Sequence, residues 1–282
     1  QFAVVAMLMT TSARAGSPIN ETLRIEPSDP VSNGEFGDAV DADGGVAIVG
    51  AKRAHGPVDD TGAAYLIDVA TGQELHKLLA ADATIDDRFG TSVAVDGNLA
   101  IVGSPEDDEN GPGSGAAYVF DVATGQQIRK ITPSDGDAGD EFGAAVDISG
   151  DIAIIGASVD EENGSSAGSA YLFDVTTGAQ LHKLLAADGQ SGDQFGVAVA
   201  VAGDDAVVGA FGDDDNGSLS GSAYIFNVDT GNQLHKLLPA DGEAGDRFGL
   251  AVDIDSGVIV VGAFGRNFEA GVAYLYDAAT GQ

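Results

Sequence analysis

The chain contains no cysteine, and it has few basic residues for its length of 282 residues. Without cysteine it has neither disulfide bonds nor thiolate zinc sites, so packing alone must hold the fold together. Only 12 lysine and arginine residues stand against 45 aspartate and glutamate residues, which gives a formal net charge of −33. Because this charge repels nucleic-acid phosphates and anionic membrane surfaces, we expect no nucleic-acid partner.

Long hydrophobic runs are also missing. No stretch reaches the roughly 18 apolar residues that a membrane span requires, so we expect no membrane insertion. The run from Phe2 to Met9 is shorter, and residues 13–15 after it have the Ala-x-Ala form of a signal-peptidase site. We predict that residues 1–15 are part of a signal peptide, that residues 16–282 form the domain, and that the protein is secreted or lies on the cell surface. A buried strand is the alternative interpretation of the run.

A repeat of 53 residues runs through most of the chain. Its last copy is irregular, because Tyr274 comes three residues early and so places a deletion in the loop before it. A fixed period of this length is typical of solenoids, propellers and similar arrays. The repeat is clearest in the Phe-Gly pairs, which begin at Phe36, Phe89, Phe142, Phe195 and Phe248.

A full copy of the repeat contains four short strands separated by turn residues. In the third copy we predict them at residues 142–148, 152–157, 170–175 and 180–185. Lys183 lies among apolar positions of the last strand, which is typical of an outer edge strand protected from aggregation by charge. Since four antiparallel strands per repeat build a propeller blade, we predict an all-β β-propeller. A β-solenoid is the alternative, although its coils are normally shorter.

The two ends of the array complement each other. Residues 22–29 align one period before residues 75–82, which contain the fourth strand of the first repeat. The last repeat stops at Gln282, where its own fourth strand is due. We therefore expect the N-terminal strand to complete the last blade and close a five-bladed ring, because closure removes exposed strand edges. Since the chain starts at Gln1 rather than methionine, the alternative is that these repeats belong to a larger propeller of a longer chain.

The segment at residues 89–121 resembles an FG-GAP repeat, the unit that builds the propeller of integrin α-subunits. The likeness rests on the Phe-Gly pair at residue 89, on Gly-Ser-Pro at residues 103–105 in place of Gly-Ala-Pro, and on Gly-x-x-Tyr ending at Tyr118. It recurs five times over residues 22–282. The resemblance implies an extracellular binding or adhesion propeller, usually seven-bladed, often with calcium held in D-x-D-x-D-G loops between the first two strands. Here the corresponding turns are too short for such loops.

Acidic residues gather in two kinds of connection, the loops between the second and third strands and the linkers between blades. In an up-and-down blade both emerge on the same face, which we therefore expect to be acidic. Carboxylates clustered in glycine- and asparagine-containing loops suit calcium, although no loop has the EF-hand spacing. The alternative is a solvating surface that binds no ion. Our candidate calcium ligands are Asp107, Asp108, Asp160, Glu162, Asp213, Asp214 and Asp215.

No pattern in the sequence indicates an enzyme. His76, His182 and His235 occupy one repeat position on three different blades, so they cannot converge on one substrate. Nucleophile elbows, phosphate loops and zinc motifs are missing. The alternative here is a hydrolase or lyase that uses loop carboxylates as acid and base.

Taken together, these patterns predict a binding or adhesion module that recognises a protein or glycan through its acidic loops, with calcium as the one candidate cofactor. The fifth loop differs from the others because it carries Arg266, Asn267 and Phe268. We take these three as candidate ligand-binding residues. A purely architectural module of a larger surface protein is the alternative.

Overall fold

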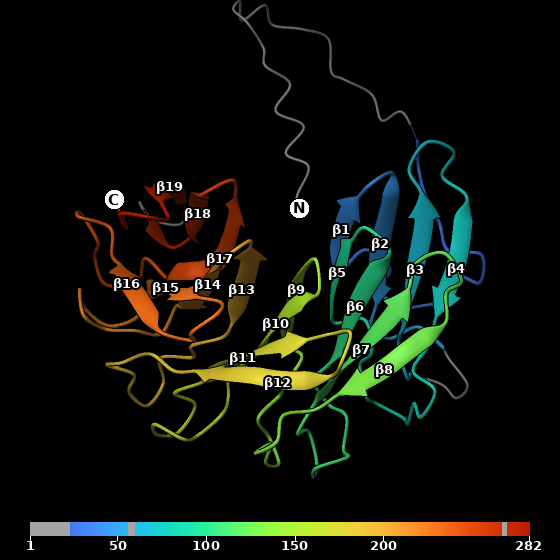
Figure 1. Cartoon of the computed structure of the whole chain (residues 1–282), viewed down its shortest axis with the longest axis horizontal. Helices are drawn as coiled ribbons and strands as arrows, with labels where there is room; N and C mark the ends of the chain where they lie inside the picture. Colours follow the sequence, from blue (N-terminus) through green and yellow to red (C-terminus); the bar gives the residue numbers. More distant parts are fainter. Residues whose placement is uncertain (1–22, 56–59, 267–269) are drawn as a thin grey trace, which may run out of the picture.

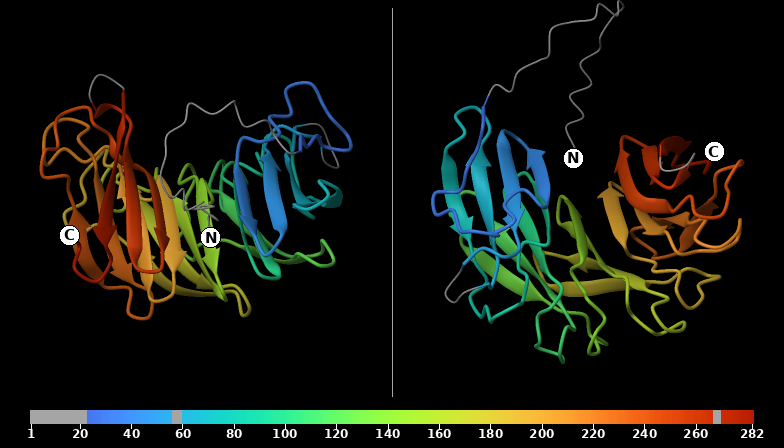
Figure 2. Two further views of the ribbon diagram at one scale, coloured as in Figure 1. Left: turned by 90° about the horizontal axis from the view of Figure 1, so that it is seen from above. Right: turned by 180° about the vertical axis from the view of Figure 1, so that it is seen from behind.

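A computed structural model of the chain describes residues 23–55, 60–266 and 270–282. These residues form nineteen strands in five antiparallel sheets. The sheets stand side by side along an open arc, and each is one propeller blade (Figures 1 and 2). The predicted all-β β-propeller architecture is confirmed, whereas the ring is not closed.

The strands follow one another across each blade in chain order. The first blade contains β1 (Val40–Asp43), β2 (Val46–Ala51), β3 (Ala63–Asp68) and β4 (Glu74–Leu78). The second contains β5 (Ser92–Asp96), β6 (Leu99–Ser104), β7 (Ala116–Asp121) and β8 (Gln127–Ile131). The third contains β9 (Ala145–Ser149), β10 (Ile152–Ala157), β11 (Ser169–Asp174) and β12 (Ala179–Leu184). The fourth contains β13 (Ala198–Ala202), β14 (Asp205–Ala210), β15 (Ser222–Asn227) and β16 (Gln233–Leu237). The fifth contains β17 (Phe248–Asp255), β18 (Val258–Ala263) and β19 (Val272–Asp277).

In the third blade, four strands lie close to the predicted ranges. The second, β10, has the predicted bounds, and β11 and β12 each begin one residue earlier than expected. The first strand, β9, begins at Ala145 rather than at Phe142. The reason is that Phe142 pairs with Gly115 of the preceding blade, as a parallel bridge, and does not join its own sheet.

The repeated glycines allow the backbones of neighbouring blades to touch. A β-carbon on Gly103 would lie 1.9 Å from the carbonyl oxygen of Gly143 in the next blade. Gly115 has a φ of +85°, and a β-carbon there would lie 2.1 Å from the oxygen of Phe142. The ring of Phe142 then meets Tyr171 edge to face, with 5.4 Å between ring centroids. The Phe-Gly pairs, the glycines that recur every 53 residues and the tyrosines therefore form one structural unit at each blade junction.

The hydrophobic core lies between blades. Ile48 and Leu66 of the first blade pack against Val102 and Phe120 of the second, and all four side chains are fully buried or nearly so. The innermost strands β1, β5, β9, β13 and β17 pack against one another in that order. Together they line a narrow central cavity of about 70 Å³.

The prediction that the N-terminal strand completes the last blade is wrong for the described residues. The segment at residues 23–29 lies on the first blade, where the backbone N–H of Ser28 donates to the carboxylate of Glu74 (3.0 Å). The equivalent contact between the first two blades joins Ala81 to Gln127 (2.9 Å). The segment therefore occupies the place of an outer strand that precedes the first blade. Because the arc is open, the first blade does not adjoin the last one, whose sheet has only three strands among the described residues.

The predicted signal peptide, residues 1–15, lies outside the described residues. Within the residues that the structure does describe, no helix is long and apolar enough to cross a membrane.

Candidate functional site

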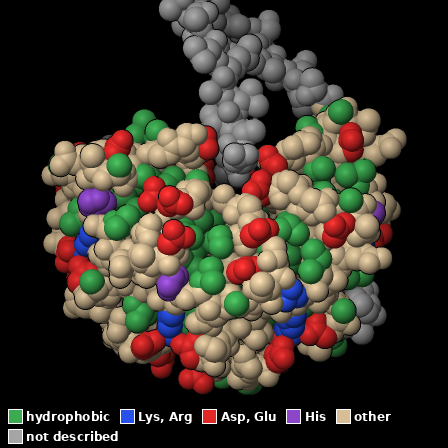
Figure 3. Space-filling view, viewed as in Figure 1, with side chains coloured by type: hydrophobic (Ala, Val, Ile, Leu, Met, Phe, Trp, Pro, Cys, Tyr) green, Lys and Arg blue, Asp and Glu red, His purple; other side chains and the backbone are tan. Residues whose placement is uncertain are grey.

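The antiparallel order of the strands gives the molecule two unlike faces. The hairpin turns within each blade lie on one, which we call the turn face. The loops after β2, β6, β10, β14 and β18 and the linkers after β4, β8, β12 and β16 lie on the other, which we call the loop face. Loops and linkers touch there, since the backbone N–H of Glu141 donates to the carbonyl of Gly113 (3.1 Å). Acidic side chains gather at the lower edge of Figure 3, with a few basic ones among them.

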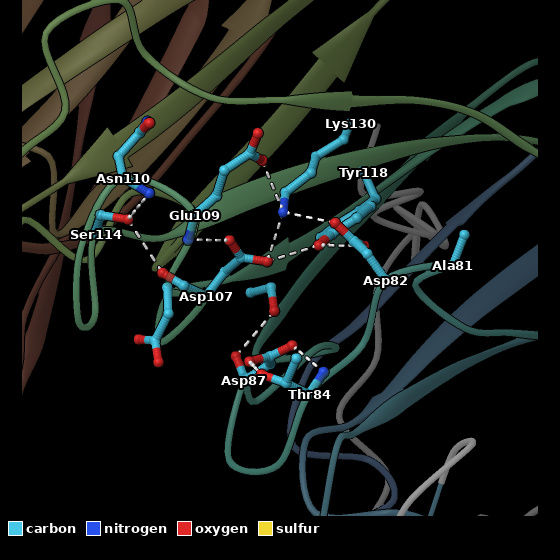
Figure 4. Close-up of polar contacts among 12 residues, drawn as sticks. Ala81, Asp82, Thr84, Asp87, Asp107, Glu109, Asn110, Ser114, Tyr118 and Lys130 are labelled. Carbon is cyan, nitrogen blue, oxygen red and sulfur yellow. Dashed lines mark hydrogen bonds and ion pairs between the residues drawn. The ribbon is translucent and has the colours of Figure 1, made fainter.

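A lysine on the fourth strand of the second blade forms ion pairs with three acidic side chains around it (Figure 4). The Nζ of Lys130 lies 2.7 Å from Asp82 and 2.9 Å from both Asp107 and Glu109. The hydroxyl of Tyr118 lies 2.7 Å from Asp107 and 2.9 Å from Asp82, and donates to one of them. The ammonium also stands 5.4 Å from the centroid of the Tyr118 ring, within range of a cation–π contact. We call this arrangement the lysine clamp.

The lysine clamp recurs in the next two blades with the same step of 53 residues. Its carboxylates come from the linker and from the loop, so each clamp ties together two connections that are distant in the sequence. Ion-pair distances from Nζ lie between 2.6 and 3.0 Å. The third blade uses Lys183 with Asp135, Asp160 and Glu162, and the fourth uses Lys236 with Asp188, Asp213 and Asp215.

In the fourth blade, electrostatics favour the charged forms of Lys236 and Asp213. Burial alone would lower the pKa of Lys236, but its hydrogen bonds to Asp188, Asp213 and Asp215 raise that pKa above the usual value. Burial alone would raise the pKa of Asp213, but the bond from Lys236 and the backbone N–H of Asp215 hold it below the usual value. The clamp is therefore an ion pair at neutral pH, with Asp213 nearly fully buried.

The two end blades use variants of the clamp. In the first blade, Lys77 pairs with Asp29 at 2.5 Å and donates to the carbonyl of His55 at 2.7 Å. In the last blade, Arg266 stands at the repeat position that Asp213 holds in the fourth blade. Its guanidinium lies 2.7 Å from Asp246 and 3.0 Å from Asp241. Each described junction on the loop face therefore has a cation supplied by the chain itself.

Most of the predicted calcium ligands belong to these clamps. The carboxylate oxygens of Asp188, Asp213 and Asp215 come within 4.8 Å of one another, a spacing that could hold a metal ion. Lys236 Nζ, however, lies 2.6 to 2.8 Å from all three, in the position that an ion would need. The clamps therefore do not fit calcium while the lysine is in place. Of the predicted set, Asp107, Asp160, Glu162, Asp213 and Asp215 lie in clamps, whereas Asp108 and Asp214 are exposed on the loops outside them.

The candidate ligand-binding residues of the fifth loop are only partly described. The side chain of Arg266 is 11% exposed and is bound to carboxylates of its own chain, so its guanidinium supports the fold. Asn267 and Phe268 lie outside the described residues.

A second set of buried carboxylates shapes the linkers. Asp140 accepts the backbone N–H of Asp137 at 2.7 Å, and Asp193 accepts that of Gln190 at 2.8 Å. Burial raises the pKa of both carboxyl groups. These side chains hold tight turns, so they are not available to a ligand.

The carboxylates that remain free line two clefts on the loop face. One cleft, of about 690 Å³, runs between the linker after β8 and the loop after β10, and Asp137 and Glu161 lie on its walls. The other, of about 400 Å³, adjoins it and includes Asp86 and Glu141. These four side chains form no ion pair within the described part of the chain, in contrast to the clamp carboxylates.

The clamp lysines are the functional residues that sequence reasoning missed. Lys183 was predicted to protect an exposed edge strand, but its side chain is 17% exposed and points to three carboxylates, so that interpretation is wrong. The signal was the shared period, because the clamp lysines and their partners recur every 53 residues. The lysines concerned are Lys77, Lys130, Lys183 and Lys236.

Known proteins share this repeat. A family model described as FG-GAP repeat matches residues 19–67, 73–120, 126–173, 179–226 and 232–276. The solved structure of the computationally designed Ika4 protein is similar at 20% sequence identity, with a TM-score of 0.47 over 73% of this chain and 99% of that one. No curated protein matches the chain. FG-GAP folds are typically non-catalytic binding or structural modules. Because the family model matches well over half of the residues, the chain belongs to the FG-GAP repeat family.

Proposed function

We propose that this protein is a secreted or cell-surface binding module that recognises a basic segment of a protein partner through its loop face, without calcium. The observation that carries the proposal is the division of carboxylates on that face. The clamp carboxylates are paired with the chain's own lysines, whereas Asp86, Asp137 and Glu161 are exposed and form no ion pair in the described part of the chain. An excess of exposed charge of one sign attracts partners of the other sign and speeds their association.

The clefts favour a polypeptide ligand over a small apolar molecule. Their walls carry mostly carboxylates, with the clamp lysine Lys183 in the larger cleft, and no aromatic side chain, whereas small-molecule pockets are mostly apolar and aromatic. A lysine or arginine side chain that enters the larger cleft would meet Asp137 on the linker side and Glu161 on the loop side. Anionic glycans would be repelled by the same groups, which is why we favour a protein among the two ligand classes that the sequence predicts.

Titration calorimetry with an octalysine peptide, in low and in physiological salt, tests this proposal. Two variants are compared, and each loses four negative charges on one face. The loop-face variant carries Asp86→Asn, Asp137→Asn, Glu141→Gln and Glu161→Gln, and the turn-face control carries Asp151→Asn, Asp204→Asn, Asp229→Asn and Asp255→Asn.

We expect the loop-face variant to bind octalysine about tenfold more weakly, because exposed ion pairs contribute about 0.3–0.5 kcal/mol each. The turn-face control should lose less than about threefold, and the difference between the variants should shrink as salt screens the charges. Equal losses in the two variants would mean that the peptide senses only the net charge. In that case the proposed site would fail, and an architectural role would stand in its place.

A further inference from the structure

The last blade presents an apolar side that no described residue covers. We call it the end face and define it by Val260 on β18 and Leu275 on β19, which are paired across the sheet. Leu275 is 70% exposed and Val260 is 39% exposed. Both Figure 1 and Figure 2 place this blade at one end of the arc.

The same side of every other blade is buried by the blade that follows. In the first blade, Ile48 and Leu66 form the equivalent pair, and both are 0% exposed because the second blade packs on them. The pattern repeats in the second, third and fourth blades, where the equivalent side chains are again 0% exposed. The chain therefore contains four examples of what covers such a face, and in each the cover is another blade.

The innermost strands show which kind of blade comes next, because blades of two kinds alternate. Position 41 of the first blade is aspartate, and its repeat equivalents are Ala94, Asp147, Ala200 and Asp253. All five line the central cavity. The first and third blades, which carry aspartate, are thus each followed by an alanine blade along the chain.

Hydrogen bonds explain the alternation. One carboxylate oxygen of Asp41 accepts the N–H of Ala42, the next residue in the chain, at 2.7 Å. The other oxygen accepts the N–H of Val95 in the second blade, also at 2.7 Å. Asp147 likewise accepts from Ile148 in its own blade and from Val201 in the fourth. The aspartate therefore accepts a backbone N–H of its own blade and the equivalent N–H of the next blade. That next blade has alanine at this position, so it offers no carboxylate to its own N–H.

At the end face this pattern is half complete. Asp253 accepts the N–H of Ile254 at 2.9 Å, and its second oxygen has no partner within the described part of the chain. The chain's first blade does not supply one, because the N–H of Ala42 is already bound by Asp41. Asp253 and Asp41 already line the same narrow cavity, so closing the chain on itself would bring these two carboxylates still closer together.

We propose that the end face is a docking surface for one further blade of the FG-GAP kind that carries a small apolar residue at the position of Asp253. That blade covers Val260 and Leu275 and donates the N–H of its innermost strand to Asp253. The chain's own aspartate-type first blade is not the occupant. The inference does not depend on the proposed ligand of the loop face.

A chain extended by one blade tests the proposal. A copy of residues 74–126 is joined after Gln282, which keeps the repeat in register and adds an alanine-type blade. The matched control is the same extension with Ala94→Asp in the appended copy only. Because the protein has no cysteine, Leu275→Cys gives one reactive thiol, and its rate of labelling by a maleimide reports how far the end face is covered.

We expect labelling to be at least tenfold slower in the extended chain than in the 282-residue chain, and at least threefold faster again with Asp in the appended copy. Asp253→Ala should remove the difference between the two extensions, as expected for directly coupled sites. Slow labelling in the 282-residue chain itself would overturn the proposal, because its end face would already be covered. Equal rates for the two extensions, or an appended blade that stays unfolded by hydrogen exchange, would overturn it as well.

Discussion

At the scale of single residues, the junction glycines have a steric task that no other residue type can perform. A β-carbon on Gly156 would lie 2.0 Å from the carbonyl oxygen of Gly196 in the next blade. We therefore expect Gly156→Ala to lower the free energy of unfolding by about 3 kcal/mol or more, measured by urea denaturation. Gly150→Ala is the control, because Gly150 has a φ of +58° but open space around it, and costs about 1 kcal/mol. Equal costs would contradict the close-approach explanation.

The clamp lysine is the second residue whose role can be isolated. Lys236→Met keeps the apolar stem but leaves Asp188, Asp213 and Asp215 facing one another without a cation. We expect a loss of about 2–4 kcal/mol in urea denaturation, since a buried charge loses its partner. Calcium should restore part of this loss, because three converging carboxylates then lack their ammonium. Lys52→Met, which breaks an ion pair nearer the surface, should cost less than about 1 kcal/mol.

This role of Lys236 would be contradicted if Lys236→Met were as stable as the unmodified protein and if calcium did not change its stability. Such a result would mean that solvent already screens the carboxylates. Asp213, however, is 4% exposed, which leaves little room for that screening.

At the scale of strands and loops, acid should weaken the blade junctions through their clamps. Burial alone would raise the pKa of Asp160 and Asp213, but the clamp lysines and neighbouring backbone N–H groups hold both below the usual value. A carboxyl with a lower pKa in the folded chain adds stability above its unfolded pKa of about 3.9 and loses it as pH falls through the folded pKa. We expect the melting temperature to fall steeply below about pH 4. In an Asp160→Asn, Asp213→Asn variant, the melting temperature should fall less steeply as the pH decreases. An equally steep fall would contradict the attribution of this acid sensitivity to the clamps.

Strand positions were readable from the sequence, whereas the contacts of the outer strands were not. A continuous apolar run next to turn residues placed β10 at its true bounds. In the sequence, the histidines of the fourth strands were recognisable only as one repeated position. In the structure, His76 Nε2 lies 3.1 Å from the carbonyl oxygen of Ala123 in the next blade. Arg129, at the same position, donates to the carbonyl of Val175. A residue pattern within one blade does not reveal which side chains reach the neighbouring blade.

The candidate site was predictable in its location and not in its chemistry. Antiparallel order is enough to gather loops and linkers on one face, so an acidic loop face follows from the sequence. The nearness of Lys130 to Asp82 and Asp107 depends on how far a fourth-strand side chain reaches past Tyr118, and this distance is a tertiary property. For that reason clustered carboxylates suggested calcium before their lysine partners were known.

At the scale of the whole molecule, the period predicted that five repeats are present but not the shape of the array. Ring closure depends on the angle between successive blades, and small changes in junction packing alter it without any change in the period. The segment at residues 23–29 has the pattern of a fourth strand, yet it lies on the first blade and not beside β19. The free end face of the last blade is the consequence of this open arrangement.

The central claim is that the protein's own cations, and not calcium, hold the acidic loop face together. Thermal unfolding in calcium, in magnesium and in chelator at matched ionic strength tests it most directly, because a ligand that binds only the folded state raises the midpoint. We predict the same midpoint in all three solutions, since the lysines already occupy the centres of the carboxylate clusters. A rise in the midpoint that is specific to calcium would contradict the claim and would make the loop carboxylates metal ligands.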